Sequence, residues 1–122
     1  MLEAVLRADV VVYASPVYVW DFSAQMKALI DRHYCFVKWQ VGDEPQHLLE
    51  GKPTLLLATC GGGAEDNGDL IQEVFAREMA YLHCRIVGQY IVPDCTLPSA
   101  LGAIAQQTAW RMTDDLLAAC GP

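Results

Sequence analysis

Two apolar runs, at residues 10–14 and 54–60, lack the alternation of apolar and polar positions that a half-exposed strand shows. A strand without alternation is typical of a parallel sheet whose two faces are both covered by helices. We therefore expect both runs to be strands buried on both faces, and we expect a third strand at residues 85–92. Pro16 ends the first strand, because proline has no N–H to donate to the ladder.

Helical spacing of apolar residues predicts four helices around these strands. They are expected over residues 2–8, after the capping residues Asp21 and Ser23, over residues 65–82, and from Pro98 or Ser99 to Cys120. The last helix is expected to turn six residues inward: Leu101, Ile104, Ala105, Thr108, Met112 and Leu116. The alternation of helix and strand indicates right-handed crossovers and a parallel sheet.

The segment between Phe36 and Glu50 has no clear period and is rich in turn-forming residues, so we expect a surface excursion. Its residues 37–50 carry Trp39 and His47. This part is a candidate lid or subunit contact, and the sequence does not choose between the two.

The chain has 122 residues, enough for one domain and too few for two, so residues 1–122 are expected to form a single domain. Hydrophobic residues make up 53% and charged residues 19%, which excludes a disordered chain. The net charge of −7 disfavours binding to nucleic acid or anionic lipid. No apolar run approaches the roughly 20 residues of a membrane span. The N-terminus lacks a signal-like pattern, so we expect a cytoplasmic protein.

The cysteines and histidines are spaced too irregularly for a metal centre or a disulfide framework. The five cysteines form no C-x-x-C pair and lie at positions 35, 60, 84, 95 and 120. We expect them to be free thiols in or near the core of a cytosolic protein, and we expect no metal site.

Candidate chemistry gathers in three segments that each follow a predicted strand: residues 15–22, 59–63 and 93–98. Ligands of open α/β sheets bind beyond the carboxyl ends of the strands, so these segments are expected to share one edge. The first contributes the aromatic Tyr18, Trp20 and Phe22, and the second contributes three consecutive glycines. Aromatic rings beside a backbone without side chains suit a planar aromatic ligand.

Each of these features also has a purely structural interpretation. The aromatic residues can pack under the following helix, and the glycines can form no more than a sharp turn. The glycines can also form a phosphate nest at a helix N-terminus. We disfavour the nest, because Glu65, Asp66 and Asp69 occupy the first helical turn and would repel a phosphate.

Two blocks of the sequence resemble a known family. Residues 8–18 read Ala-Asp-Val-Val-Val-Tyr-Ala-Ser-Pro-Val-Tyr, and residues 23–32 end in the pattern formed by Lys27, Asp31 and Arg32. Together they look like the third strand, flavin loop and following helix of NADPH-dependent FMN reductases. Residues 49–53, Leu-Glu-Gly-Lys-Pro, resemble the start of the family's next unit. The charged residues of the helix are expected to form surface or interhelix ion pairs.

The resemblance implies a flavodoxin-like α/β fold, a three-layer sandwich around a parallel sheet with strand order 2-1-3-4-5. By this match the chain supplies the third, fourth and fifth strands, and the first strand, its phosphate-binding loop and the second strand have no counterpart. The chain is then either truncated at the N-terminus or a member whose missing part another chain supplies. The domain is then partial, and residues 10–14 form an apolar edge strand, which is a pairing hazard. We expect a homodimer or an added strand to cover that edge.

The resemblance also implies FMN as cofactor and NAD(P)H as co-substrate, with the flavin supplying the chemistry. The residues carried over as flavin-binding are Ser15, Pro16, Val17, Tyr18, Val19, Trp20, Thr59, Cys60, Gly61, Gly62 and Gly63. The glycine N–H groups are expected near the polar edge of the ring. No side chain is expected to act as an acid or a base, and no iron–sulfur centre is expected. The lack of a phosphate loop leaves the FMN affinity open.

Three functions compete on this basis. The first is an FMN-dependent NAD(P)H oxidoreductase of the flavin or quinone reductase type, or the C-terminal part of one. The second is a flavodoxin-like module without flavin that has a structural or interaction role. The third is an FMN electron carrier without a nicotinamide site. The sequence does not fix the electron acceptor or the choice between NADH and NADPH.

Overall fold

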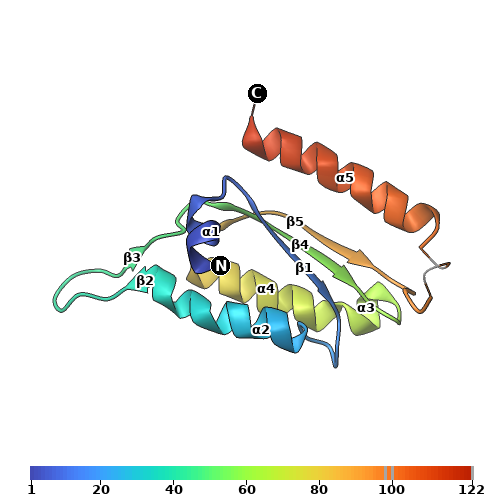
Figure 1. Ribbon diagram of the computed structural model, residues 1–122, viewed down its shortest axis with the longest axis horizontal. Coiled ribbons are helices and arrows are strands. Elements are labelled where there is room, and N and C mark those ends of the chain that lie inside the picture. Colours follow the sequence, from blue (N-terminus) through green and yellow to red (C-terminus); the bar gives the residue numbers. More distant parts are fainter. Residues whose placement is uncertain (98, 100, 122) are drawn as a thin grey trace.

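A parallel three-stranded sheet in the order β1-β4-β5 forms the centre of the computed structural model, which describes residues 1–97, 99 and 101–121 (Figure 1). The elements in chain order are α1 (Leu2–Arg7), β1 (Val11–Pro16), α2 (Ala24–Ile30), the 3-10 helix η1 (Asp31–Phe36), β2 (Val37–Lys38), β3 (Gln46–His47), β4 (Pro53–Thr59), α3 (Ala64–Asn67), α4 (Asp69–Tyr81), β5 (Arg85–Val92) and α5 (Ala103–Cys120). The register pairs Val11 with Thr54 and Thr54 with Ile86. The predicted parallel sheet is thereby confirmed.

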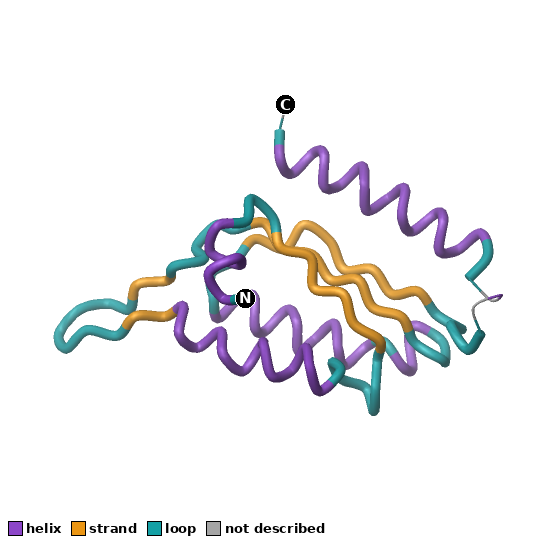
Figure 2. Tube along the Cα trace, in the orientation of Figure 1, coloured by secondary structure: helices purple, strands orange, loops and turns teal. Residues whose placement is uncertain are grey.

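The helices form two layers, with α2 and α4 on one face of the sheet and α5 on the other (Figures 1 and 2). On α4, Ile71, Phe75 and Met79 are completely buried and belong to one apolar cluster with Tyr13 and Leu56 of the sheet. Burying a large apolar side chain stabilises a fold by about 1.5–3 kcal/mol. The layer between the sheet and α4 is therefore the main core.

β1 is buried on one face only, which corrects the expectation of a strand covered on both sides. Tyr13 and Ser15 are buried, whereas Val12 is 38% exposed and Ala14 is exposed as well. The physical reason is position: in the described part of the chain β1 is an edge strand paired with β4 alone. The helix on this face, α5, packs on β5 instead of reaching across to β1. The central strand β4 is buried along most of its length.

Two of the predicted helices have different boundaries in the structure. The helix expected over residues 65–82 is divided into α3 and α4 at Gly68. A Cβ atom at Gly68 would lie 2.7 Å from Cγ2 of Ile91, so this position approaches the sheet too closely for a side chain. The last helix begins at Ala103, after Ser99, and the alternative start at Pro98 lies outside the described residues.

The inward face of α5 is only partly buried. Thr108 is buried, and the three residues Ala105, Met112 and Leu116 are half-buried. Ile104 is 53% exposed, so the expectation that it faces inward was wrong. Leu101, which precedes α5, is 48% exposed but lines a hollow together with Leu57 of β4 and Thr108 of α5. Helical spacing identifies which residues share a face, but it does not determine how closely that face approaches the sheet.

The segment expected as a surface excursion forms an antiparallel hairpin of β2 and β3 that projects beyond the sheet (Figure 1, left). Its base belongs to the core, because Phe36, Val37 and Leu49 are buried. The ring of His47 stacks on that of His83, with 3.6 Å between their centroids. The hairpin is therefore anchored at its base, and its tip is exposed.

Candidate functional site

The base of the loop after β1 is fixed by hydrogen bonds to the start of α2. The buried Ser15 donates through Oγ to the carbonyl of Pro16 at 2.8 Å and accepts the N–H of Ser23 at 3.0 Å. Ser23 in turn caps α2, since its Oγ accepts the N–H of Met26 at 3.3 Å. Phe22 is buried in the main core, so packing under the helix is the correct interpretation for this one aromatic residue.

The tip of this loop is a two-residue turn closed by Tyr18 and Asp21. Their backbones exchange two N–H···O bonds, of 3.0 and 3.2 Å. Val19 and Trp20 occupy the centre of the turn with φ angles of 52° and 64°. Tyr18 and Trp20 remain 63% and 47% exposed, so their rings are available at the end of the strand instead of being part of the core.

The triple glycine after β4 forms an open turn that leads into α3. The N–H of Gly62 donates to Oδ1 of Asn67 at 3.2 Å. A Cβ at Gly63 would meet nothing within 4 Å, and one at Gly61 would only touch Thr96 at 4.0 Å. The backbone on both sides of Gly62 therefore has room beside it for a flat group.

Backbone hydrogen bonds bring the predicted segments together. The N–H of Val17 donates to the carbonyl of Thr59 at 2.8 Å, which joins the end of β1 to the end of β4. The indole N–H of Trp20 donates to the carbonyl of Asp66 at 2.9 Å. The third segment joins the second, because the N–H of Cys95 donates to the carbonyl of Cys60 at 2.8 Å. All three segments share the carboxyl edge of the sheet, as parallel strands require.

A cavity of ≈ 320 Å³ opens at this edge. Thr59 forms one wall, and Cys95, Thr96, Leu97 and Leu101 form the others. It adjoins the triple glycine, since Thr96 is the residue that a side chain at Gly61 would touch. The edge thus combines exposed rings, accessible backbone and a hollow.

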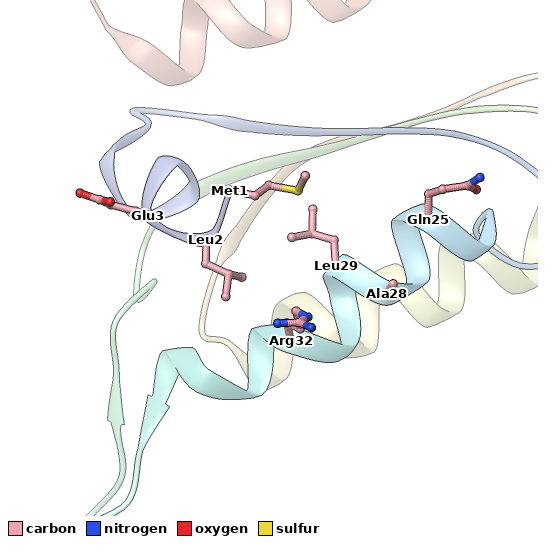
Figure 3. A pocket seen from close by; sticks show the side chains of 7 residues that line it. All are labelled: Met1, Leu2, Glu3, Gln25, Ala28, Leu29 and Arg32. Atoms are coloured by element: carbon pink, nitrogen blue, oxygen red, sulfur yellow. The ribbon is translucent and has the colours of Figure 1, made fainter.

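A larger hollow of ≈ 520 Å³ lies elsewhere, between α1 and α2 (Figure 3). The side chains of Met1, Leu2 and Leu29 border this gap, and the carboxylate of Glu3 points away from it. The helix α1 lies at the opposite end of the sheet from the three loops, because it leads into the start of β1. Nζ of Lys52, next to the start of β4, donates to the carbonyl of Ala8 at the end of α1. We assign no ligand to this hollow, since it lies away from the carboxyl edge.

The thiol of Cys60 at this edge is not an activated nucleophile. Burial, together with nearby Cys95 and Asp94, raises the pKa of the Cys60 thiol, so this thiol is protonated at neutral pH. On the following helix, Lys27 pairs with Asp31 at the surface, as expected for an ion pair. Among the described residues, no three His, Cys, Asp or Glu side chains come together in a way that could hold a metal ion. No helix in the same part of the chain is long and apolar enough to cross a membrane.

The arrangement fits the ring of a flat aromatic ligand better than a phosphate group. Rings at Tyr18 and Trp20 offer apolar faces, and the N–H groups flanking Gly62 offer donors. Glu65 and Asp66 follow immediately in the first turn of α3, where their charge opposes an anion. The described residues of this edge can therefore contact a flat aromatic group, whereas the acidic first turn of α3 disfavours an anion beside the triple glycine.

Sequence reasoning did not identify Asp66 and Asn67 as parts of this edge. Asp66 contributes a backbone carbonyl, which carries no side-chain signature. Asn67 contributes an amide oxygen to Gly62 from five residues away, a spacing common in many turns. The loop containing Cys95 and Thr96 was expected at the edge, but these residues were not singled out.

Known proteins are similar to this chain in sequence. Residues 1–93 match the family model described as NADPH-dependent FMN reductase. The chain is 32% identical over 82 residues to an FMN-dependent NADH:quinone oxidoreductase of Bordetella parapertussis, covering 65% of this chain and 39% of that protein. It thus spans about two fifths of that relative's length.

Solved structures are similar in fold. The Trp repressor binding protein from Bacillus subtilis superposes with a TM-score of 0.71 at 17% identity, covering 88% of this chain and 64% of that one. The general stress protein 14 of Treponema denticola, in complex with FMN, superposes with a TM-score of 0.65 at 15% identity, covering 93% and 68%.

Proposed function

The chain belongs to the NADPH-dependent FMN reductase family, and from this premise we propose that it carries the ring-binding edge of an FMN-dependent NAD(P)H oxidoreductase. Its fold is flavodoxin-like, as expected from the sequence. We propose that residues 1–122 belong to one domain of that fold. The observation that carries the proposal is the 2.8 Å bond from Val17 to Thr59, which holds the aromatic turn beside the triple glycine.

In this proposal the flavin ring lies on the carboxyl edge, between the turn after β1 and the turn after β4. Tyr18 and Trp20 flank the ring, and the N–H groups of Gly61 and Gly63 face its polar edge. Ser15, Pro16, Val17, Val19, Thr59, Cys60 and Gly62 complete the predicted binding set. When bound, FMN would supply the redox chemistry of hydride transfer from NAD(P)H. The protein's part is to orient the ring and shield it from water.

Relatives indicate the class of acceptor. The Bordetella relative is named as a quinone oxidoreductase and the family as FMN reductases, so a quinone or a free flavin is the proposed electron acceptor. A cytoplasmic location belongs to the same proposal, because all five cysteines are free thiols, which a reducing compartment maintains.

We also propose that a second copy of the chain, or another strand, covers the edge of β1. Val12 and Ala14 are exposed there, and the strand pairs with β4 alone among the described residues. An exposed apolar edge strand is a template for pairing. Light scattering after size-exclusion chromatography should give the mass of a dimer or larger species. A stable monomer across the accessible concentration range would contradict the proposal.

The test of flavin binding compares the wild-type chain with a variant whose added side chain blocks the proposed site of the flavin ring. Gly63→Val should preserve the fold, because no atom lies within 4 Å of the new Cβ, and it should weaken FMN binding at least tenfold by filling the proposed ring site. The control Gln107→Val adds the same side chain on an exposed face of α5. Quenching of flavin fluorescence on titration with protein gives the Kd.

An activity assay on the wild-type protein distinguishes between the competing functions. Oxidation of NADPH or NADH with added FMN and a quinone, followed at the nicotinamide absorbance, is expected for the reductase. FMN binding without this activity indicates an electron carrier. If neither the wild-type chain nor Gly63→Val quenches flavin fluorescence, the chain is a module without flavin and the proposal is overturned.

A further inference from the structure

The two-residue turn after β1 has a backbone conformation that its sequence does not favour. Val19 and Trp20 both have positive φ angles, 52° and 64°, in a turn that is usually built from asparagine and glycine. A β-branched residue such as valine is an outlier in this region, because its Cβ substituents crowd the backbone. Such a conformation persists only where surrounding contacts hold it.

Two sets of contacts hold this turn. The first is local: the backbones of Tyr18 and Asp21 bond to each other, and Oδ1 of Asp21 accepts the N–H of Phe22 at 2.7 Å. The second reaches a distant segment, since the indole N–H of Trp20 donates to the carbonyl of Asp66 at 2.9 Å. The two residues are 46 positions apart along the chain.

The acceptor of the Trp20 bond belongs to the other side of the proposed ring site. Asp66 lies in α3, a four-residue helix whose carbonyls have few partners within the helix. Its neighbour Asn67 accepts the N–H of Gly62 through Oδ1 at 3.2 Å. A continuous path of hydrogen bonds and chain therefore runs from the aromatic turn, through α3, to the middle of the triple glycine.

We infer that Trp20 is a positioning residue: its indole N–H latches the aromatic turn to α3 and fixes the spacing between the two walls of the ring site. The hydrogen bond that forms the latch is present in the protein without ligand. Its effect on FMN affinity depends on the proposed function. A turn already held in the bound arrangement spares the ligand the cost of ordering it. Loss of the N–H should therefore weaken ring binding even when the aromatic surface is unchanged.

The decisive variant replaces Trp20 by 3-benzothienylalanine, which has the shape of tryptophan but sulfur in place of the N–H. Incorporation of 5-fluorotryptophan at the same position keeps the N–H and serves as the rescue. Trp20→Phe gives a genetically simple version, and Trp110→Phe, at an exposed tryptophan on α5, is the matched control. Hydrogen exchange measured by mass spectrometry reports on the latch, and flavin fluorescence reports on FMN binding.

In the protein without ligand, peptides covering residues 16–22 and 61–67 should exchange at least threefold faster after loss of the N–H. Wild-type rates are expected with 5-fluorotryptophan and with Trp110→Phe. The Kd for FMN should rise about 3- to 10-fold in the benzothienyl protein, in line with the loss of one hydrogen bond. The thermal midpoint should stay within about 2 °C of the wild type, because the bond is exposed.

Three outcomes overturn the inference in different ways. Unchanged exchange in the benzothienyl protein means that no latch exists. Faster exchange with an unchanged Kd means that the latch does not position the ring. A large drop in the thermal midpoint means that Trp20 has a general structural role. If the wild-type chain binds no FMN, the proposed function fails, and the exchange experiment still decides whether the latch exists.

Discussion

The imidazole of His33 is completely buried, and its Nδ1 lies 3.2 Å from Oε1 of Glu78 on α4. The ring of Tyr13 stands edge-on to the same imidazole, with 5.6 Å between centroids, and burial raises the pKa of its phenol above the usual range. Within the described residues, the hydroxyl of Tyr13 and Nε2 of His33 have no hydrogen-bond partner. Among the described residues, Glu78 is therefore the single side-chain partner of the buried imidazole of His33. Their contact joins η1 to α4.

Replacing Glu78 by alanine should destabilise the protein by about 1–3 kcal/mol, because the buried Nδ1 of His33 then loses its partner. Glu78→Gln keeps an acceptor oxygen and should cost less than half as much. The matched control is Glu73→Ala on the same helix, which breaks an exposed pair with Arg77 and should change stability by less than about 0.5 kcal/mol. Urea unfolding gives all three values. Equal losses at positions 73 and 78 would contradict the role given to His33.

Lys52 ties α1 to the sheet, since its Nζ donates to the carbonyls of Leu6 at 3.1 Å and Ala8 at 2.5 Å. Lys52→Met keeps most of the side-chain carbon but removes both bonds, so stability should fall by about 1–2 kcal/mol. Amides of residues 4–8 should exchange with solvent faster in this variant. Lys38→Met, at an exposed position on the hairpin, should leave both measurements unchanged.

Gly68 should not tolerate a side chain. A Cβ there would lie 2.7 Å from Cγ2 of Ile91 and 3.0 Å from the carbonyl of Ala64, and the second contact is with backbone. We expect Gly68→Ala to lower the free energy of unfolding by about 1–3 kcal/mol through overpacking. Gly63→Ala meets no atom within 4 Å and should be neutral or stabilising by up to about 1 kcal/mol. Similar thermal midpoints for the two variants would contradict the overpacking at Gly68.

The protein should lose stability in alkali through Cys84. Burial raises the pKa of this thiol from 9.0 to about 11, with Glu78 adding to the effect and Lys52 opposing it. The unfolded thiol ionises near its ordinary pKa, so the unfolded state gains stability as the pH rises from 9 to 11. Between pH 8 and pH 10.5, the wild type should lose about 1–2 kcal/mol more than Cys84→Ala. Parallel unfolding curves in reducing buffer make the comparison, and equal losses would refute it.

The sequence was sufficient to predict those parts of the fold that follow from hydrophobic periodicity and from the family resemblance. The apolar runs identified the strands, and the loops after them, including those with Tyr18 and Gly62, do meet at one edge. Parallel pairing determines this result, because it places the carboxyl ends of the strands together.

Other features depend on tertiary contacts that no local pattern encodes. Val12 lies in an apolar run but is partly exposed, since α5 packs on β5 and leaves β1 uncovered on that face. Ile104 fits the helical spacing, yet α5 leaves it 53% exposed. The turn at Val19 contains no glycine or asparagine that would predict a positive φ, so its conformation was not foreseeable from residue type.

The register of the sheet has a consequence for how the chain folds. Val11 pairs with Thr54, and Thr54 pairs with Ile86, so both ladders join segments more than 30 residues apart. Neither ladder can form from a local hairpin, and each requires a long loop to close before any strand contact is gained. Strand pairing must therefore wait until distant segments meet, and we expect the rate of refolding to respond more to substitutions at Phe75, in the core that joins these segments, than to changes in the hairpin of β2 and β3.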